Sequence, residues 1–301
     1  MSEKVIKSYK AFDKNMQCRG FKYEIGKEYE MDVEIKCCDR GFHACKSPME
    51  VWDHYDMLSS RFAEVEQSGK IDEEENSTKV CSSHIKIKAE LKLADIIKVG
   101  VEWLKDITSP TKVNTDIAKN DNGCNSAKIG SSGDYAQIGS SGDSAKIGSS
   151  GYSAKIGSSG NYAQIGSSGD SAQIGSSGDS AQIGSSGDYA KIGSSGDSAQ
   201  IGSSGNSAKI GSSGDYAKIG SSGDSAQIDS TGEYSVIMCA GKESKAKAKV
   251  GSWITLTEWE WNDDKKRIVP LCVKTEYVDG NNIKADTWYQ LKNGEFVEVT
   301  E

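Results

Sequence analysis

Hydrophobic and polar residues follow a fixed period through the middle of this chain. From about residue 125 to 234 the sequence repeats a nonapeptide of the form I-G-S-S-G-D-S-A-Q or I-G-S-S-G-D-Y-A-K. Isoleucine recurs every nine residues, at Ile129, Ile138, Ile147, Ile156, Ile165, Ile174, Ile183, Ile192, Ile201, Ile210, Ile219, Ile228 and Ile237. Self-similarity at such a short fixed period predicts a solenoid.

Each repeat is predicted to form one short strand and one turn. An alanine, or Ser235 in the last repeat, stands two residues before each isoleucine. Residues two apart share a face of a strand, and because this face alone is apolar, we expect it to form the core. The S-S-G-D segment is typical of a turn, with a glycine able to adopt a positive φ. Two glycines per repeat exclude a helix. The pattern therefore predicts a mainly β protein built around a parallel β-helix.

The tyrosines suggest how many repeats complete one coil. Tyrosine precedes the alanine at Tyr135, Tyr162, Tyr189 and Tyr216, which are 27 residues apart. In a three-sided coil of 27 residues, all four would stack outward on one face. We therefore predict a three-sided solenoid of about four coils, roughly 20 Å tall. A two-sided roll of 18 residues per coil, in which the tyrosines alternate between opposite faces, is the alternative.

The segment before the array has the patterns of an ordinary globular domain, and we assign residues 1–118 to a small α+β domain. Strands are expected in VIKSYKAF, FKYEIGKEYEM, EIKCCDRGFHAC and the strictly alternating HIKIKAELKL. Helices are expected in SPMEVWDHYDML, with Ser47 as N-cap and Pro48 in the first turn, and in LADIIKVGVEWLKDI.

The array and the segment after it complete the predicted domain organisation. Residues 119–252 are assigned to the solenoid, with a degraded terminal coil at Ala248–Ser252. Residues 253–301 hold four of the six tryptophans and several hairpin turns, among them Asn293–Gly294. They predict a C-terminal β-hairpin domain with an aromatic core.

Charge and composition limit the function classes. The chain has 36 basic and 44 acidic residues, a formal net charge of −8, which disfavours a dedicated nucleic-acid binder. No apolar stretch approaches the length of a membrane-spanning helix, and the start lacks the apolar segment of a secretory signal. The eight cysteines are too sparse for a disulfide scaffold. We therefore expect reduced thiols, a cytoplasmic location and no membrane partner.

A calcium site in the turns is considered and not assigned. Calcium-binding β-rolls place an aspartate two residues before the apolar position, whereas Asp143 stands four before Ile147. Asn125, Tyr152, Asn161 and Asn206 also occupy the aspartate position in other repeats. We expect the aspartates to stabilise turns.

The cysteines and histidines near the N-terminus are the other candidate for chemistry. Cys18, Cys37, Cys38, His43, Cys45 and His54 lie close together in sequence. Their spacing departs from the paired ligands of zinc sites, so we expect buried thiols and assign no metal, no cofactor and no catalytic residue. A Cys–His pair of Cys45 or Cys38 with His43 or His54 keeps an enzyme or metal site as an alternative.

Three segments carry a resemblance that covers the whole chain. The stretch YKAFDKNMQCRGFKYEIGKEYE, the following CCDRGFHACKSPMEVW and the ending KADTWYQLKNGEFVEV resemble a family of uncharacterised bacteriophage and prophage proteins with a central glycine-rich array. The resemblance implies a viral, intracellular context in a bacterial host. It implies no activity and no active site.

These observations favour a non-enzymatic binding or scaffold protein. The rigid solenoid is expected to engage a macromolecule, most readily a host or phage protein, through the exposed column of Tyr135, Tyr162, Tyr189 and Tyr216, since tyrosine is enriched at interfaces. Antagonism of a host defence is a hypothesis that rests on the phage context. A structural spacer in the virion, where the solenoid could oligomerise, and mimicry of nucleic acid by the acidic array are the other readings.

Overall fold

The computed structural model describes residues 4–74, 77–107 and 125–300. The chain divides into two compact units, Met1–Trp103 and Leu104–Glu301. The predicted boundary between residues 118 and 119 lies outside the described residues. The boundary predicted between residues 252 and 253 falls within the second unit, where one strand belongs to both the solenoid and the C-terminal hairpin.

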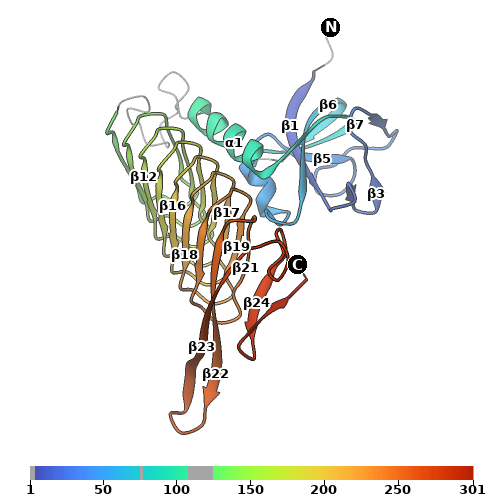
Figure 1. The fold of residues 1–301 in the computed structure, drawn as a ribbon. Coiled ribbons are helices and arrows are strands. Elements are labelled where there is room, and N and C mark those ends of the chain that lie inside the picture. The colour runs from blue at the N-terminus through green and yellow to red at the C-terminus, as the bar shows by residue number, and fades with distance from the viewer. Residues whose placement is uncertain (1–3, 75–76, 108–124, 301) are drawn as a thin grey trace. The chain divides into compact units, whose positions relative to one another are not determined.

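The first unit is a small β domain whose sheet closes on itself (Figure 1). Strand β1 (Ile6–Phe12) pairs with β5 (Phe42–Cys45) and with β6 (Arg61–Glu73). Strand β7 (Lys79–Leu91) pairs with β5 and β6 and, further along the same edge as β5, with β4 (Glu28–Glu30). Because β1, β5, β7 and β6 form a closed ring, segments distant in sequence line one interior.

Short elements complete this unit. Strands β2 (Gln17–Cys18) and β3 (Phe21–Lys22) form a small hairpin. The helix expected from Ser47 onward is only a 3-10 turn, η1 (Met49–Asp53), preceded by Pro48 and without a side-chain cap. Helix α1 (Leu93–Ile107) forms as the pattern predicts. No helix in the described ranges combines the length and apolarity that a membrane crossing requires.

The second unit contains two nine-stranded sheets, which Figure 1 shows running along the solenoid. The first sheet consists of β8 (Lys128–Ser131), β10 (Lys146–Ser149), β12 (Gln164–Ser167), β14 (Gln182–Ser185), β16 (Gln200–Ser203), β18 (Lys218–Ser221), β20 (Val236–Cys239), β22 (Trp253–Asn262) and β23 (Arg267–Tyr277). The second consists of β9 (Gln137–Ser140), β11 (Lys155–Ser158), β13 (Gln173–Ser176), β15 (Lys191–Ser194), β17 (Lys209–Ser212), β19 (Gln227–Ser230), β21 (Lys245–Lys247), β24 (Tyr289–Lys292) and β25 (Glu295–Glu298).

The register shows a two-sided coil. Ile147 pairs in parallel with Ile129 and Ile165, eighteen residues before and after it, and Ile156 pairs likewise with Ile138 and Ile174. Successive repeats therefore alternate between the two sheets, and the described chain forms seven coils from β8 to β21. The parallel solenoid is confirmed, but the three-sided coil of 27 residues and the estimate of about four coils are wrong.

The tyrosine spacing misled the prediction because these residues lie in turns, outside the strands. Tyr135, Tyr162, Tyr189 and Tyr216 have φ values of 59°, 57°, 59° and 59°. Serine occupies the same left-handed position in the other repeats, for example Ser180 at φ 56°. The 27-residue phase of the tyrosines is therefore no multiple of the 18-residue coil, and it decorates alternate edges of the solenoid.

The predicted isoleucine and alanine core is confirmed. Ile156, Ile174 and Ile192 are fully buried, as are the alanines that precede them by two residues. Each buried isoleucine contributes about 1.5–3 kcal/mol relative to an exposed one, and only stacking supplies its neighbours. The stability of the solenoid is therefore a property of adjacent coils rather than of a single repeat.

Turn aspartates and asparagines connect the coils at both edges. The Oδ1 atom of Asp179 accepts a hydrogen bond from the backbone N–H of Asp197 at 3.0 Å, and Asp197 accepts one from Asp215 at 2.9 Å. Asn161 and Asn206 serve equally, accepting from Asp179 and Asp224 at 2.9 Å. These side chains act as acceptors for the next coil, which explains why aspartate and asparagine exchange freely along the array.

We expect Asp197→Ala to lower the free energy of unfolding by about 1 kcal/mol, because the N–H of Asp215 loses its acceptor. Asp197→Asn keeps the accepting oxygen and should be within about 0.5 kcal/mol of the parent chain. Chemical denaturation of the two variants, followed by circular dichroism, measures the difference. Equal losses in both variants would show that the carboxylate charge, and not the hydrogen bond, is what matters.

The C-terminal segment closes the stack. Strand β22 starts in parallel register with β20, with Ile237 opposite Ile254, and then extends into an antiparallel hairpin with β23. Figure 1 shows this hairpin projecting beyond the coils. The β24–β25 hairpin turns at Asn293 and Gly294, both with positive φ, as the sequence predicts.

Candidate functional site

The structure does not gather the four predicted tyrosines on one face. Tyr135 and Tyr189 lie in turns leading from the first sheet to the second, whereas Tyr162 and Tyr216 lie in turns leading back. All four are exposed, by 57 to 68%. The rings that do meet are of other pairs: Tyr216 stacks on Tyr234 of the next coil, with ring centroids 5.5 Å apart. A continuous tyrosine column is therefore absent from the described coils.

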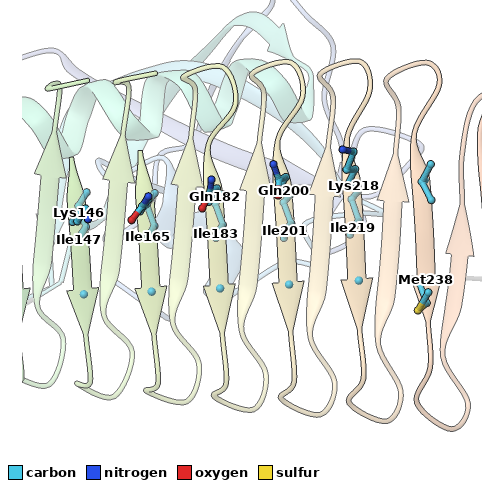
Figure 2. A pocket seen from close by; sticks show the side chains of 17 residues that line it. Lys146, Ile147, Ile165, Gln182, Ile183, Gln200, Ile201, Lys218, Ile219 and Met238 are labelled. Carbon is cyan, nitrogen blue, oxygen red and sulfur yellow. The ribbon is translucent and has the colours of Figure 1, made fainter. Parts of the chain in front are cut away.

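A long groove runs across the outer surface of the first sheet, and the sequence gave no direct sign of it. We call it the glycine groove. Its lining includes Lys146, Gln164, Gln182, Gln200 and Lys218 along one row and Gly148, Gly166, Gly184, Gly202 and Gly220 along another. Figure 2 shows Lys146, Gln182, Gln200 and Lys218 in line across successive strands, with Met238 at the end. The groove has a volume of about 1000 Å³.

The floor of the glycine groove is open. A Cβ atom added at Gly166, Gly184 or Gly202 would meet no atom within 4 Å, and none of these residues needs a positive φ. Glycine in a strand interior weakens the strand because it costs conformational entropy and packs nothing. The fold of this sheet therefore does not require glycine at these positions, and their effect is to leave a flat strip of exposed backbone.

The C-terminal end of the same surface is apolar, and we call it the apolar end. Val236, Trp253 and Tyr277 lie side by side on three adjacent strands and are exposed by 50, 47 and 42%. Met238 and Val273 extend the patch and are exposed by 53 and 60%. Sequence analysis assigned the C-terminal tryptophans to an aromatic core, yet Trp253 is at the surface, 5.1 Å from the Tyr277 ring.

The charge of this surface differs from that of the chain. The outward strand positions from β8 to the start of β22 carry Lys128, Lys146 and Lys218 and no acidic residue. The aspartates lie in the turns at the two edges. A surface with a neutral to basic strip between acidic edges therefore exists on a chain whose net charge is −8.

The first unit contains a second candidate site, a cavity of about 790 Å³ within the closed sheet region. Strands β1 and β5 contribute Lys10, His43 and Cys45, and the β2–β3 hairpin contributes Cys18 and Arg19. The further lining residues are Tyr9, Ala11, Phe21, Tyr23, Met31, Cys38, Gly41, Phe42, Ala44, Val51, Asp53, His54, Tyr55 and Lys79. Four of the six residues of the predicted Cys/His cluster other than Cys37 and Cys38 thus meet here.

Lys10 is the central polar group of this cavity. Its side chain is only 4% exposed, and its Nζ donates to the carbonyl oxygen of His43 at 2.8 Å and lies 3.4 Å from the Cys18 sulfur. Burial lowers the pKa of Lys10 below its usual value, an effect that the neighbouring thiols partly oppose. Cys18 is in turn hydrogen-bonded to the hydroxyl of Tyr55.

His43 lies beside Lys10 with a strongly cationic environment. Burial is the main cause that lowers the pKa of His43, and the charges of Lys10 and Arg19 lower it further. The Nε2 atom of His43 is buried and has no hydrogen-bond partner among the described residues. The neutral imidazole is therefore the form that the protein favours near neutral pH.

The predicted alternatives of a metal site or a Cys–His pair can be placed on this geometry. Among the described residues, no three His, Cys, Asp or Glu side chains converge as a metal ion would require. Cys38 lies in a turn with a φ of 68°, and its sulfur lies 3.9 Å from a carboxylate oxygen of Glu74. Lys10, Arg19 and Tyr55, which sequence analysis did not single out, dominate the polar contacts of the cavity.

The comparisons with known proteins bear on the first unit alone. No match to the chain was found among curated proteins, and none among solved structures. A family model described as a domain of unknown function (DUF7666) matches residues 6–99, the segment that contains every residue lining the cavity.

Proposed function

We propose that this chain is a non-enzymatic binding protein whose solenoid holds a protein partner against the glycine groove and its apolar end. The observation that carries the proposal is the contiguous surface formed by a side-chain-free floor and the exposed row of Val236, Trp253 and Tyr277. Exposed aromatic and aliphatic side chains of this kind supply most of the binding energy at protein interfaces.

Charge favours a protein over a nucleic acid as the partner. Three lysines on the surface can pair with carboxylates, while the aspartate rows at both edges would repel a continuous phosphate backbone. The flat floor suits an extended segment whose backbone lies close to the sheet. We infer an acidic or neutral polypeptide surface with apolar side chains that reach Trp253 and Met238.

The setting proposed for this binding is the cytoplasm of a bacterial host, with the chain encoded by a phage. The resemblance of the segments around Cys18–Glu30 and Gly41–Cys45 to phage and prophage proteins supports the origin. The seven described cysteines are all free thiols, which supports a reducing compartment. Antagonism of a host defence is the role we propose for the interaction within this setting.

Filling the groove tests the proposal without weakening the fold. In Gly166→Thr/Gly184→Thr/Gly202→Thr, the new side chains occupy open space and have higher strand propensity than glycine. We expect an unchanged or raised melting temperature together with at least about tenfold weaker partner binding. A photo-reactive residue in place of Gln182 identifies the partner in infected cells, and calorimetry on the purified pair measures Kd.

Edge variants provide the matched control. Tyr135→Ser/Tyr162→Ser/Tyr189→Ser/Tyr216→Ser changes exposed turn residues outside the groove and should leave Kd unchanged. Partner binding that survives the filled groove but fails in the tyrosine variant would reject the groove as the binding surface. Recovery of the chain in purified virions, with no partner crosslinked from Gln182, would support the alternative function of a structural spacer.

A further inference from the structure

The cavity of the first unit holds a buried cation without a counter-charge. Among the described residues no carboxylate lies within ion-pair distance of Lys10, and its contacts are a carbonyl oxygen and a thiol. Removing an ammonium group from water is costly unless a negative charge compensates. The second basic group at the cavity, the exposed Arg19, also has no carboxylate partner in the described part of the chain.

Arg19 occupies a backbone position that disfavours it. Arg19 and Gly20 form the two-residue turn between β2 and β3, with φ values of 51° and 78°. This turn type favours asparagine, aspartate or glycine at its first position, and other side chains are strained there. Strain of this kind is tolerated where a side chain is needed at a site. Two basic residues therefore stand at one cavity, each at a cost to the fold.

The remaining walls are aromatic. Phe21 is 45% exposed and packs edge-on against the Tyr23 ring at 4.8 Å between centroids. Phe42 lies 6.3 Å from both of these rings. A volume of about 790 Å³ is in the range of sites for small organic ligands. The walls thus offer ring faces and edges next to the unpaired positive charges of Lys10 and Arg19.

We propose that this cavity is a binding site for a small planar organic anion, in which an aromatic ring lies against Phe21 and Tyr23 and a phosphate or carboxylate group pairs with Lys10 and Arg19. The guanidinium of Arg19 can bind such a group through two hydrogen bonds, and the ammonium of Lys10 supplies a point charge from inside the cavity. The unpartnered Nε2 atom of His43 is a further polar contact for the ligand.

Calorimetric titration of the full chain with four probes tests the chemistry. Adenosine 5′-monophosphate and indole-3-carboxylate carry a ring and an anion, adenosine carries the ring alone, and inorganic phosphate carries the anion alone. We expect at least one of the two ring anions to bind at least about tenfold more tightly than adenosine and inorganic phosphate. The stronger of the two identifies the anionic group. Binding of adenosine as tight as that of its monophosphate, or no binding of either ring anion, would overturn the proposal.

Two variants separate a binding role from a structural one. Lys10→Met and Arg19→Asn should each weaken the ring anion by at least about tenfold while leaving the melting temperature unchanged or higher. Lys22→Gln, an exposed lysine in the same hairpin but outside the lining, should bind like the parent. Unaltered affinity in both cavity variants would contradict the assignment. Arg19→Asn alone decides the question if Lys10→Met fails to fold, because Arg19 is at the surface.

Discussion

Gly187→Ala is expected to destabilise the solenoid by about 3 kcal/mol or more. A Cβ atom at Gly187 would lie 2.1 Å from the carbonyl oxygen and 2.4 Å from the carbonyl carbon of Gly169 in the preceding coil. Both atoms belong to backbone, so the coils would have to separate. Around this turn, separation stretches the bonds from Ser186 to Ser167 at 2.9 Å and from Lys191 to Ala172 at 2.8 Å.

A neighbouring glycine provides the control for this prediction. Gly184 belongs to the same repeat but its added Cβ would meet nothing within 4 Å. Gly184→Ala should therefore be neutral or stabilise by up to about 1 kcal/mol through the unfolded state. Thermal unfolding and amide hydrogen exchange across the array compare the two variants. Similar melting temperatures for both would show that the coils can yield at the turns.

Lys10→Met should stabilise the first unit at neutral pH by about 1–3 kcal/mol, because an apolar side chain of similar length replaces a buried ammonium without a counter-charge. Denaturant unfolding, followed for the transition of the first unit, measures the change. Lys22→Gln, which alters an exposed lysine, should stay within about 0.5 kcal/mol of the parent. Loss of stability in Lys10→Met would mean that the hydrogen bond to the His43 carbonyl outweighs desolvation.

The gain from Lys10→Met should depend on pH with a defined sign. The pKa of Lys10 is lowered in the folded state, so between that pKa and about 10.5 the unfolded chain binds more protons than the folded one. The free energy of unfolding of the parent therefore rises with pH across this window. The advantage of the variant is largest below the folded-state pKa and disappears as the pH approaches about 10.5. A pH-independent difference would contradict the titration of Lys10 as its source.

The strands and core of the solenoid were predictable, whereas the number of sides was not. Ala and Ile two residues apart specify an inward face in any coil, because each side is one nonapeptide whether the coil has two sides or three. The distinguishing signal lay outside the regular repeats. Asp229 and Lys247, which replace the usual small residues eighteen positions apart, form an ion pair at 3.1 Å between adjacent coils. The tyrosines carried no such information, because a left-handed turn residue makes no side-specific contact with the core.

The cavity depended on contacts that sequence patterns do not reveal. Sequence analysis identified the Cys/His cluster from proximity along the chain, but β1 and β5 meet only through the pairing of Tyr9 with Cys45. That pairing brings Lys10 beside His43, and the small β2–β3 hairpin then adds Cys18 and Arg19. Alternation along β1 indicates a strand, but it does not show that a lysine within it is buried in the closed sheet. The exposure of Trp253 was missed for the same reason, since composition alone placed the tryptophans in a core.

The two-sided register makes the solenoid an adjustable ruler. Adding or deleting two nonapeptides inserts or removes one whole rung, which lengthens or shortens the surface leading to Trp253 by one strand spacing and preserves every lateral neighbour. An odd number instead shifts all preceding rungs to the opposite wall. Recombination between the near-identical units of the coding sequence could therefore change the reach of the molecule in discrete steps, while the terminal hairpins that close the stack remain as they are.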